Sequence, residues 1–174
     1  TLAGPLTING NTVTGGTGVN NGSAFGAGLF LQGNGTVTFA PGTGQSQTVS
    51  DVIADQTGSG GTGGNAGSYG VVKEGAGTTT LSALNTYSGG TTINAGTLAL
   101  SGAGDISASS GVTVGSGATF LVGDGGFAEI ASLAGGGAVA IGSIDETTLL
   151  LLTGTTASPA TVFSGTFAGP GSLE

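Results

Sequence analysis

The chain has 174 residues, of which 40 are glycine, and a formal net charge of −8. Its single basic side chain, Lys73, leaves no basic patch for the phosphates of nucleic acids or anionic lipids. Because cysteine and histidine are absent, disulfides, thiol nucleophiles, zinc sites and imidazole-dependent catalysis are excluded. With 37% hydrophobic residues the chain has enough apolar surface to fold, and it lacks the Gly-X-Y period of collagen.

Short runs rich in threonine, valine, leucine and isoleucine alternate with Gly, Asn and Ser turns, and no window has the three-and-four spacing of a helix. The longest purely apolar run, at 149–152, is far shorter than the roughly 20 residues of a membrane-spanning helix. The sequence therefore predicts an all-β segment that does not insert into a membrane. In chain order the expected strands lie at 6–9, 28–32, 36–40, 78–82, 97–101, 118–123 and 138–142.

Apolar residues recur at a nearly fixed spacing. Two series can be followed, and within each the successive members are 19 to 22 residues apart. Leu98, Phe120 and Val139 precede members of the second series by two residues, as a shared inward face requires. A fixed period of this length predicts stacked structural repeats. The first series is Ile8, Leu29, Val49, Val71, Ile93, Val114, Leu133 and Leu152, and the second is Leu81, Leu100, Val122, Ile141 and Phe163.

A period of about 20 residues with two or three short strands is typical of one rung of a parallel β-solenoid. We therefore expect an all-β, right-handed parallel β-helix with about 20 residues per rung, formed by residues 1–174 as a single segment. About eight rungs would make a rod roughly 40 Å long, because neighbouring rungs lie about 4.8 Å apart. The alternative is a β-sandwich built from hairpins, which Asn9-Gly10 between the runs 6–8 and 12–14 would suit.

Residues 56–68 form a glycine-rich stretch in which Ala66 is the one apolar residue. Such a segment can add little to a core, so we expect a flexible loop that bulges from a rung corner. It is read either as a tolerated insertion or as a recognition loop of low affinity. The two tyrosines, Tyr69 and Tyr87, are expected to pack at rung edges.

The most distinctive stretch of the chain follows this loop. Residues 75–82 read GAGTTTLS and residues 85–101 read NTYSGGTTINAGTLALS. This stretch closely resembles the passenger-associated transport repeat of bacterial autotransporters; the best match is at 69–102, and the likeness extends to 174. The chain departs from the family pattern at Thr79, where leucine is common, and at Ala83-Leu84, where smaller residues are usual. Residues 20–29 resemble rungs of pectate-lyase-like adhesins.

The resemblance implies a passenger segment of a secreted autotransporter. Such a passenger is secreted or displayed on the cell surface, anchored at the bacterial outer membrane by a β-barrel translocator that lies C-terminal to this chain. Residues 169–174 look like the start of another repeat. We therefore expect the chain to be a fragment of a longer passenger.

Carboxylate pairs are the candidates for catalysis, because glycosidases use two carboxyl groups at a set separation, one with a raised pKa. Asp124 and Asp145 are 21 residues apart, so they could stack about 5 Å from each other on successive rungs. We nevertheless expect solvated corner residues, and we predict no catalytic residue and no enzyme activity. The other pairs considered are Asp51 with Asp55, Asp124 with Glu129, and Asp145 with Glu146.

Glycine-rich stretches can indicate calcium-binding nonapeptides or phosphate loops. The stretches at 102–105 and 123–126 each contain an aspartate, but they do not recur at a nine-residue spacing. No Gly-Lys-Ser/Thr sequence follows a glycine-rich loop, which excludes a P-loop. We therefore predict no metal site and no cofactor.

These features favour a structural stalk or adhesin segment that mediates surface display, adhesion or self-association. Hydroxyl and amide side chains along its flanks would make weak contacts that add up when many copies align. The expected partners are a host surface, a polysaccharide or other copies of the chain, and nucleic acid is excluded. The alternatives are a scaffold for a carried enzyme or toxin, and a β-helix that acts on polysaccharides.

Overall fold

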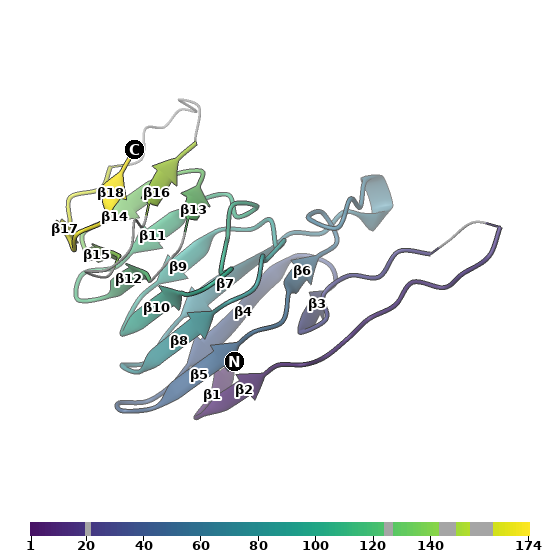
Figure 1. Cartoon of the computed structure of the whole chain (residues 1–174), viewed down its shortest axis with the longest axis horizontal. Coiled ribbons are helices and arrows are strands. Elements are labelled where there is room, and N and C mark those ends of the chain that lie inside the picture. The colour runs from purple at the N-terminus through teal and green to yellow at the C-terminus, as the bar shows by residue number, and fades with distance from the viewer. Residues whose placement is uncertain (20–21, 124–126, 143–148, 154–161) are drawn as a thin grey trace.

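The computed structural model describes residues 1–19, 22–123, 127–142, 149–153 and 162–174. The chain winds as a coil whose short strands stack into sheets along its sides (Figure 1). Every strand pair in these ranges is parallel. The prediction of an all-β parallel solenoid is confirmed, and the hairpin sandwich is wrong.

One side of the solenoid is a seven-stranded sheet in which each strand pairs with its equivalents one rung away. Its seven strands give seven rungs in the described part of the chain, one fewer than the number estimated from the sequence. In spatial order the strands are β2 (Leu6–Ile8), β5 (Ser46–Val49), β8 (Thr78–Leu81), β10 (Thr97–Leu100), β12 (Thr119–Val122), β15 (Ala138–Ile141) and β17 (Thr166–Ala168).

Two other sides complete each rung. A six-stranded sheet precedes the seven-stranded one along the chain, and shorter strands that follow it form the third side. The six strands are β1 (Leu2–Ala3), β4 (Gly35–Ala40), β7 (Tyr69–Lys73), β9 (Thr91–Ile93), β11 (Val112–Val114) and β14 (Leu133–Gly135). The third side has β3 (Leu29–Leu31) paired with β6 (Ile53–Asp55), and β13 (Phe127–Ile130), β16 (Leu149–Leu152) and β18 (Ser172–Leu173) in one sheet.

The seven runs expected as strands are all strands, with ends that agree to within one residue. Threonine and the branched aliphatic residues suit these strands because one face packs inside the coil and the other meets solvent. In β12, for example, Phe120 and Val122 are buried, whereas Thr119 and Leu121 are partly exposed. The same alternation recurs in β5, β8 and β15.

The core is a set of ladders that run from rung to rung. Leu81, Leu100, Val122 and Ile141 are in register on successive strands and are all buried, as predicted. Burying each such side chain contributes about 1.5–3 kcal/mol, so the stack supplies much of the stability. A second ladder of buried residues on the same sheet contains Leu98, Phe120 and Val139, as their spacing also predicted.

The remaining ladder assignments are only partly correct. Phe163 does not continue the second series, because it forms a bridge with Gly135 on the six-stranded side. The first series does not form one stack, because its members belong to three sides of the solenoid. Ile93 and Val114 are in register, but Leu133 aligns with Val112, two residues earlier. Dense apolar residues produced a regular spacing that the register does not follow.

The rung length of about 20 residues holds only in the middle of the chain. Along the seven-stranded sheet the residues from Leu81 to Ile141 step by 19, 22 and 19. Upstream, Val49 pairs with both Ile8 and Leu81, so the steps are 41 and 32 residues. Two insertions explain the longer steps, an arm made of residues 9–19 and 22–28 and the loop 56–68 (Figure 1).

Tight turns join the six-stranded sheet to the seven-stranded sheet, and glycine is needed in them. Gly96 has a φ of 64°, a left-handed conformation that other residues rarely adopt. A Cβ atom at this position would lie 2.3 Å from the carbonyl oxygen of Gly77 in the turn of the preceding rung. Successive turns therefore stack backbone on backbone.

Candidate functional site

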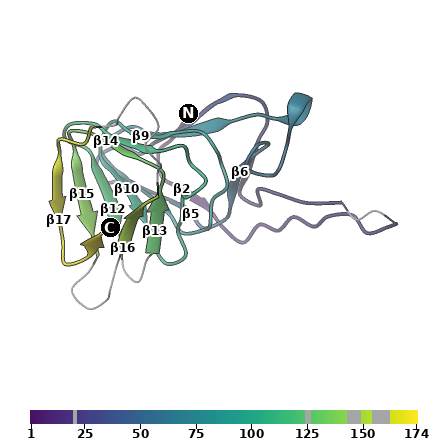
Figure 2. The same cartoon turned by 90° about the horizontal axis from the view of Figure 1, so that it is seen from above.

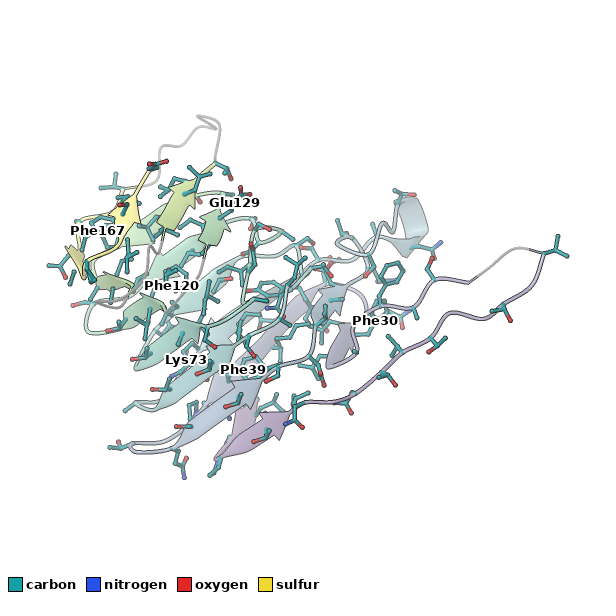
Figure 3. All side chains as sticks on the ribbon, viewed as in Figure 1. Phe30, Phe39, Lys73, Phe120, Glu129 and Phe167 are labelled. Atoms are coloured by element: carbon teal, nitrogen blue, oxygen red, sulfur yellow. The ribbon has the colours of Figure 1, made fainter. Side chains whose placement is uncertain are left out.

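Lys73, the single basic side chain, is fully buried inside the solenoid (Figure 3). Its Nζ donates hydrogen bonds to the carbonyl oxygens of Glu74, Gly75 and Ala95, at 2.7, 2.8 and 3.0 Å. Burial lowers the pKa of Lys73 below its usual value of 10.5, and the nearby charge of Glu74 partly opposes this effect. The ammonium group joins the turns of two successive rungs and presents no surface to a ligand.

Asp55, at the end of β6, is a second buried charge. Its carboxylate accepts hydrogen bonds from the backbone N–H groups of Gly58, Tyr69 and Ser88, at 2.7, 2.9 and 2.6 Å, and from Ser88 Oγ at 2.8 Å. Burial alone would raise the pKa of Asp55, but these hydrogen bonds outweigh it and hold the pKa below its usual value of 3.8. Asp55 therefore fastens both ends of the loop 56–68 to the next rung.

The loop 56–68 leaves the solenoid between β6 and β7 and contains a short 3-10 helix, η1 (Gly63–Asn65). Its base is closed by a backbone hydrogen bond of 3.0 Å from Thr57 N–H to the Gly67 carbonyl oxygen. Gln56 Oε1 also accepts from the N–H of Gly33, at 2.7 Å. The loop is thus held by specific contacts, in addition to its two chain connections.

The arm is fastened at its base by Asp51. One carboxylate oxygen of Asp51 accepts from the backbone N–H of Asn11 at 2.9 Å and from Asn11 Nδ2 at 2.7 Å. The backbone hydrogen bond is the main reason that the pKa of Asp51 lies below its usual value of 3.8. Further out, the N–H of Gly22 donates to the Gly16 carbonyl oxygen at 2.8 Å and links the two limbs of the arm.

The structure brings none of the candidate carboxylate pairs together as a catalytic site within the described ranges. Asp51 and Asp55 each bind main-chain donors of a different insertion. Glu129 lies on β13, and Asp124, Asp145 and Glu146 lie outside the described residues. In the described part of the chain, no group of three or more acidic residues is placed to hold a metal ion.

Buried polar side chains inside the solenoid were missed by the sequence analysis. Asn85 accepts from the N–H of Ile53 at 3.0 Å and donates to the carbonyl oxygens of Ala83 and Asp105, at 2.8 and 3.1 Å. These contacts join three successive rungs. Its position before the Tyr-Ser-Gly-Gly turn was the one available signal, and it does not distinguish an internal asparagine from a turn asparagine.

Tyr87 was expected at a rung edge, but it lies in the core with 1% of its surface exposed. Its hydroxyl is 2.8 Å from Thr91 Oγ1, which is 3.0 Å from Ser109 Oγ, and Ser109 Oγ donates to the Gly89 carbonyl oxygen at 2.8 Å. Because the hydroxyl group has a partner, the ring can be buried without a desolvation penalty. Tyr69 is only partly exposed, and its ring lies against Gly35.

The departures from the family pattern have structural explanations at Thr79 but not at Leu84. Thr79 points inward, and its hydroxyl donates to Gln47 Oε1 at 3.2 Å. Gln47 Nε2 in turn donates to the carbonyl oxygens of Leu2 and Gly4, at 2.9 and 2.8 Å. A leucine at position 79 would leave the buried Gln47 oxygen without this donor. Leu84 is 57% exposed, and nothing in the structure explains it.

Comparison with known proteins gives one family. Residues 71–100 match the family described as the passenger-associated-transport-repeat. This segment is an autotransporter passenger repeat. Such a repeat implies a secreted or surface-exposed protein. No curated protein and no solved structure matches the chain. Among the described residues, no helix is both long and apolar enough to cross a membrane.

The passenger repeat corresponds to two stacked rungs. It runs from within β7 to the end of β10 and contains Lys73, Asn85 and Tyr87. Each of these buried polar side chains makes a hydrogen bond to another rung or within a turn. The polar residues of the repeat therefore hold the solenoid together and do not form a binding site.

Proposed function

We propose that this chain is a stalk segment of an autotransporter passenger, a rigid spacer displayed outside the cell. The observation that supports it is the unbroken parallel stack of seven strands from β2 to β17. Every rung buries its inward side chains against those of its neighbours, so no rung can open without exposing two layers of the core. Such a coil transmits force along its axis and holds whatever it carries away from the surface.

The carboxylates support a structural function over a catalytic one. A glycosidase needs one carboxyl group whose pKa is raised, so that it can donate a proton near neutral pH. In Asp51 and Asp55 the hydrogen bonds lower the pKa instead. Both groups are ionised acceptors that fasten insertions. A β-helix that acts on polysaccharides is therefore the weaker proposal.

Adhesion is the second candidate function, and the arm favours it. Val13, Val19 and Phe25 on the arm are 47%, 104% and 43% exposed. The arm and the loop 56–68 project from the same side of the solenoid (Figure 2). Exposed apolar side chains on a protruding segment suit contact with another macromolecule. In this proposal a C-terminal β-barrel outside the chain anchors the passenger at the outer membrane.

Single-molecule stretching tests the stalk function. The chain has no cysteine, so one cysteine added at each end gives unique attachment points. We expect stepwise unfolding, with about 70 Å of contour length released per rung in residues 78–141. Extension without steps at low force would contradict a stalk. For adhesion, the variant V13S/V19S/F25S should lose attachment to a cell layer while its thermal unfolding is unchanged.

A further inference from the structure

The outer face of the seven-stranded sheet is the widest regular surface of the molecule (Figure 1). From β5 to β15 each strand pairs with the next over four residues in register, without a bulge. Alternate residues point outward, so two rows of side chains run along the solenoid. One row is Ser46, Thr78, Thr97, Thr119, Ala138 and Thr166, and the other is Thr48, Thr80, Ala99, Leu121, Ala140 and Ala168.

No residue in these two rows is charged, although the chain carries a net charge of −8. Most of the side chains are small and end in a methyl or a hydroxyl group. In the described part of the chain, the hydroxyls of Thr78, Thr97 and Thr119 make no hydrogen bond to another side chain or to the main chain. The face therefore has unused donors and acceptors and no charge that must be desolvated.

We propose that a second copy of this chain packs on this outer face, sheet against sheet, about a two-fold axis. The proposal deepens the stalk function proposed above, on which it rests. The repeat distance favours this partner, because a second copy has the same spacing of about 4.8 Å between rungs. Contacts made at one rung then recur at each of the others.

Electrostatics restrict how two copies can approach. Two chains of charge −8 repel each other, and the repulsion is smallest where the facing surfaces carry no charge. The outer face of the six-stranded sheet is also uncharged, with Thr38, Val72, Thr92, Thr113 and Ala134 in its central row. However, β9, β11 and β14 have only three residues each, so that face presents one row where the seven-stranded sheet presents two.

The size of the face predicts a weak pair. Seven strands about 4.8 Å apart and four residues long cover roughly 400 Å² per copy. Stable interfaces bury about 800 Å² per partner, so we expect a Kd of about 0.1–1 mM for one segment. Aligned copies on a surface would add such contacts along their whole length.

Sedimentation equilibrium of the purified chain tests the proposal with a matched pair of variants. T97D/T119D places two carboxylates on neighbouring strands of the seven-stranded sheet, facing outward. T92D/T113D does the same on the six-stranded sheet, at the same two rungs. Both variants have the same charge. We expect T97D/T119D to weaken the dimer at least 10-fold, and T92D/T113D to weaken it less than 3-fold.

Three results would overturn the proposal. A wild-type chain that stays monomeric at millimolar concentration, even in 1 M salt where repulsion is screened, would exclude the pair. Equal weakening by both variants would mean general charge repulsion. Binding of a neutral polysaccharide such as dextran that only T97D/T119D loses, without a dimer, would make a glycan the occupant. All three leave the stretching test of the stalk function unaffected.

Discussion

The two halves of the solenoid fill their interiors with different chemistry. From β5 to β9 the core contains buried polar and charged side chains, each hydrogen-bonded. In β10, β12 and β15 the buried side chains are all apolar. Figure 3 shows Lys73 in the first half and Phe120 in the second. The buried polar group of the first half comprises Gln47, Asp55, Lys73, Thr79, Asn85 and Thr91.

This difference follows from where the insertions lie. The arm and the loop 56–68 interrupt the first half, and main-chain groups at their ends have no equivalent in the next rung to pair with. Every buried main-chain donor or acceptor needs a partner. Asp55 supplies acceptors for N–H groups at the loop, and Gln47 supplies a donor for carbonyl oxygens at the start of the chain. The second half has short turns and continuous ladders between β10 and β15, so apolar packing suffices.

The largest effect is expected where the core is purely apolar. L100D should unfold the central rungs, because an unpaired buried carboxylate costs several kcal/mol and no donor lies nearby to accept it. That loss is comparable to the whole stability of a small domain. Circular dichroism during heating measures the change. The outward-facing T119D is the control, and an unchanged melting temperature for L100D would show that position 100 is not core.

Removing the charge of Asp55 should be the next largest effect. D55N replaces a carboxylate that accepts four hydrogen bonds, and we expect a loss of about 2–4 kcal/mol. The pKa of Asp55 is lowered in the folded state, so its contribution is present above pH 4 and is lost as the pH falls through the folded value. Urea unfolding at pH 7 and pH 3 should differ less for D55N than for the wild type.

Lys73 allows the opposite pH dependence to be tested. K73M leaves the carbonyl oxygens of Glu74, Gly75 and Ala95 without their donor, and we expect a loss of about 2 kcal/mol at pH 7. Because the pKa of Lys73 is lowered, the folded chain binds fewer protons than the unfolded chain as the pH approaches 10.5. The stability contributed by Lys73 therefore rises with pH in that window.

Urea unfolding between pH 7 and pH 10 measures this effect. E74Q is the control, because it removes the neighbouring charge and leaves the ammonium group in place. A rise in stability with pH that persists in K73M would assign it to another group.

The sequence predicted the second half of the fold well because its rungs contain no insertions. There, equal spacing in the chain corresponds to equal position in the coil, as for Leu100 and Val122. In the first half, insertions break that relation, and Leu29 and Val49 appeared equivalent although they lie on different sides. Register is set by strand pairing, which spacing alone does not reveal when loop lengths vary.

The buried polar residues were not predictable for a different reason. Lys73, Asn85 and Asp55 have the composition of turn residues, and their partners are main-chain atoms 20 or more residues away or in the adjoining loop. A sequence pattern records side-chain types but not the main-chain groups that a turn leaves unpaired. Tyr87 shows the same limit, since the partner that permits its burial is a hydroxyl four residues away.

The smallest effect concerns the arm, which is fastened to the solenoid but contributes little to its core. D51A removes the acceptor of both hydrogen bonds from Asn11. Since these contacts are solvent-exposed, the melting temperature should not change. The base of the arm should open more often, and cleavage by chymotrypsin after the exposed Phe25 should become several-fold faster. D105A removes a carboxylate that holds Ser107 elsewhere in the coil, so it should leave this cleavage rate unchanged. If D51A also lowers the melting temperature, the arm is part of the cooperative unit; if neither quantity changes, Asp51 does not hold the arm.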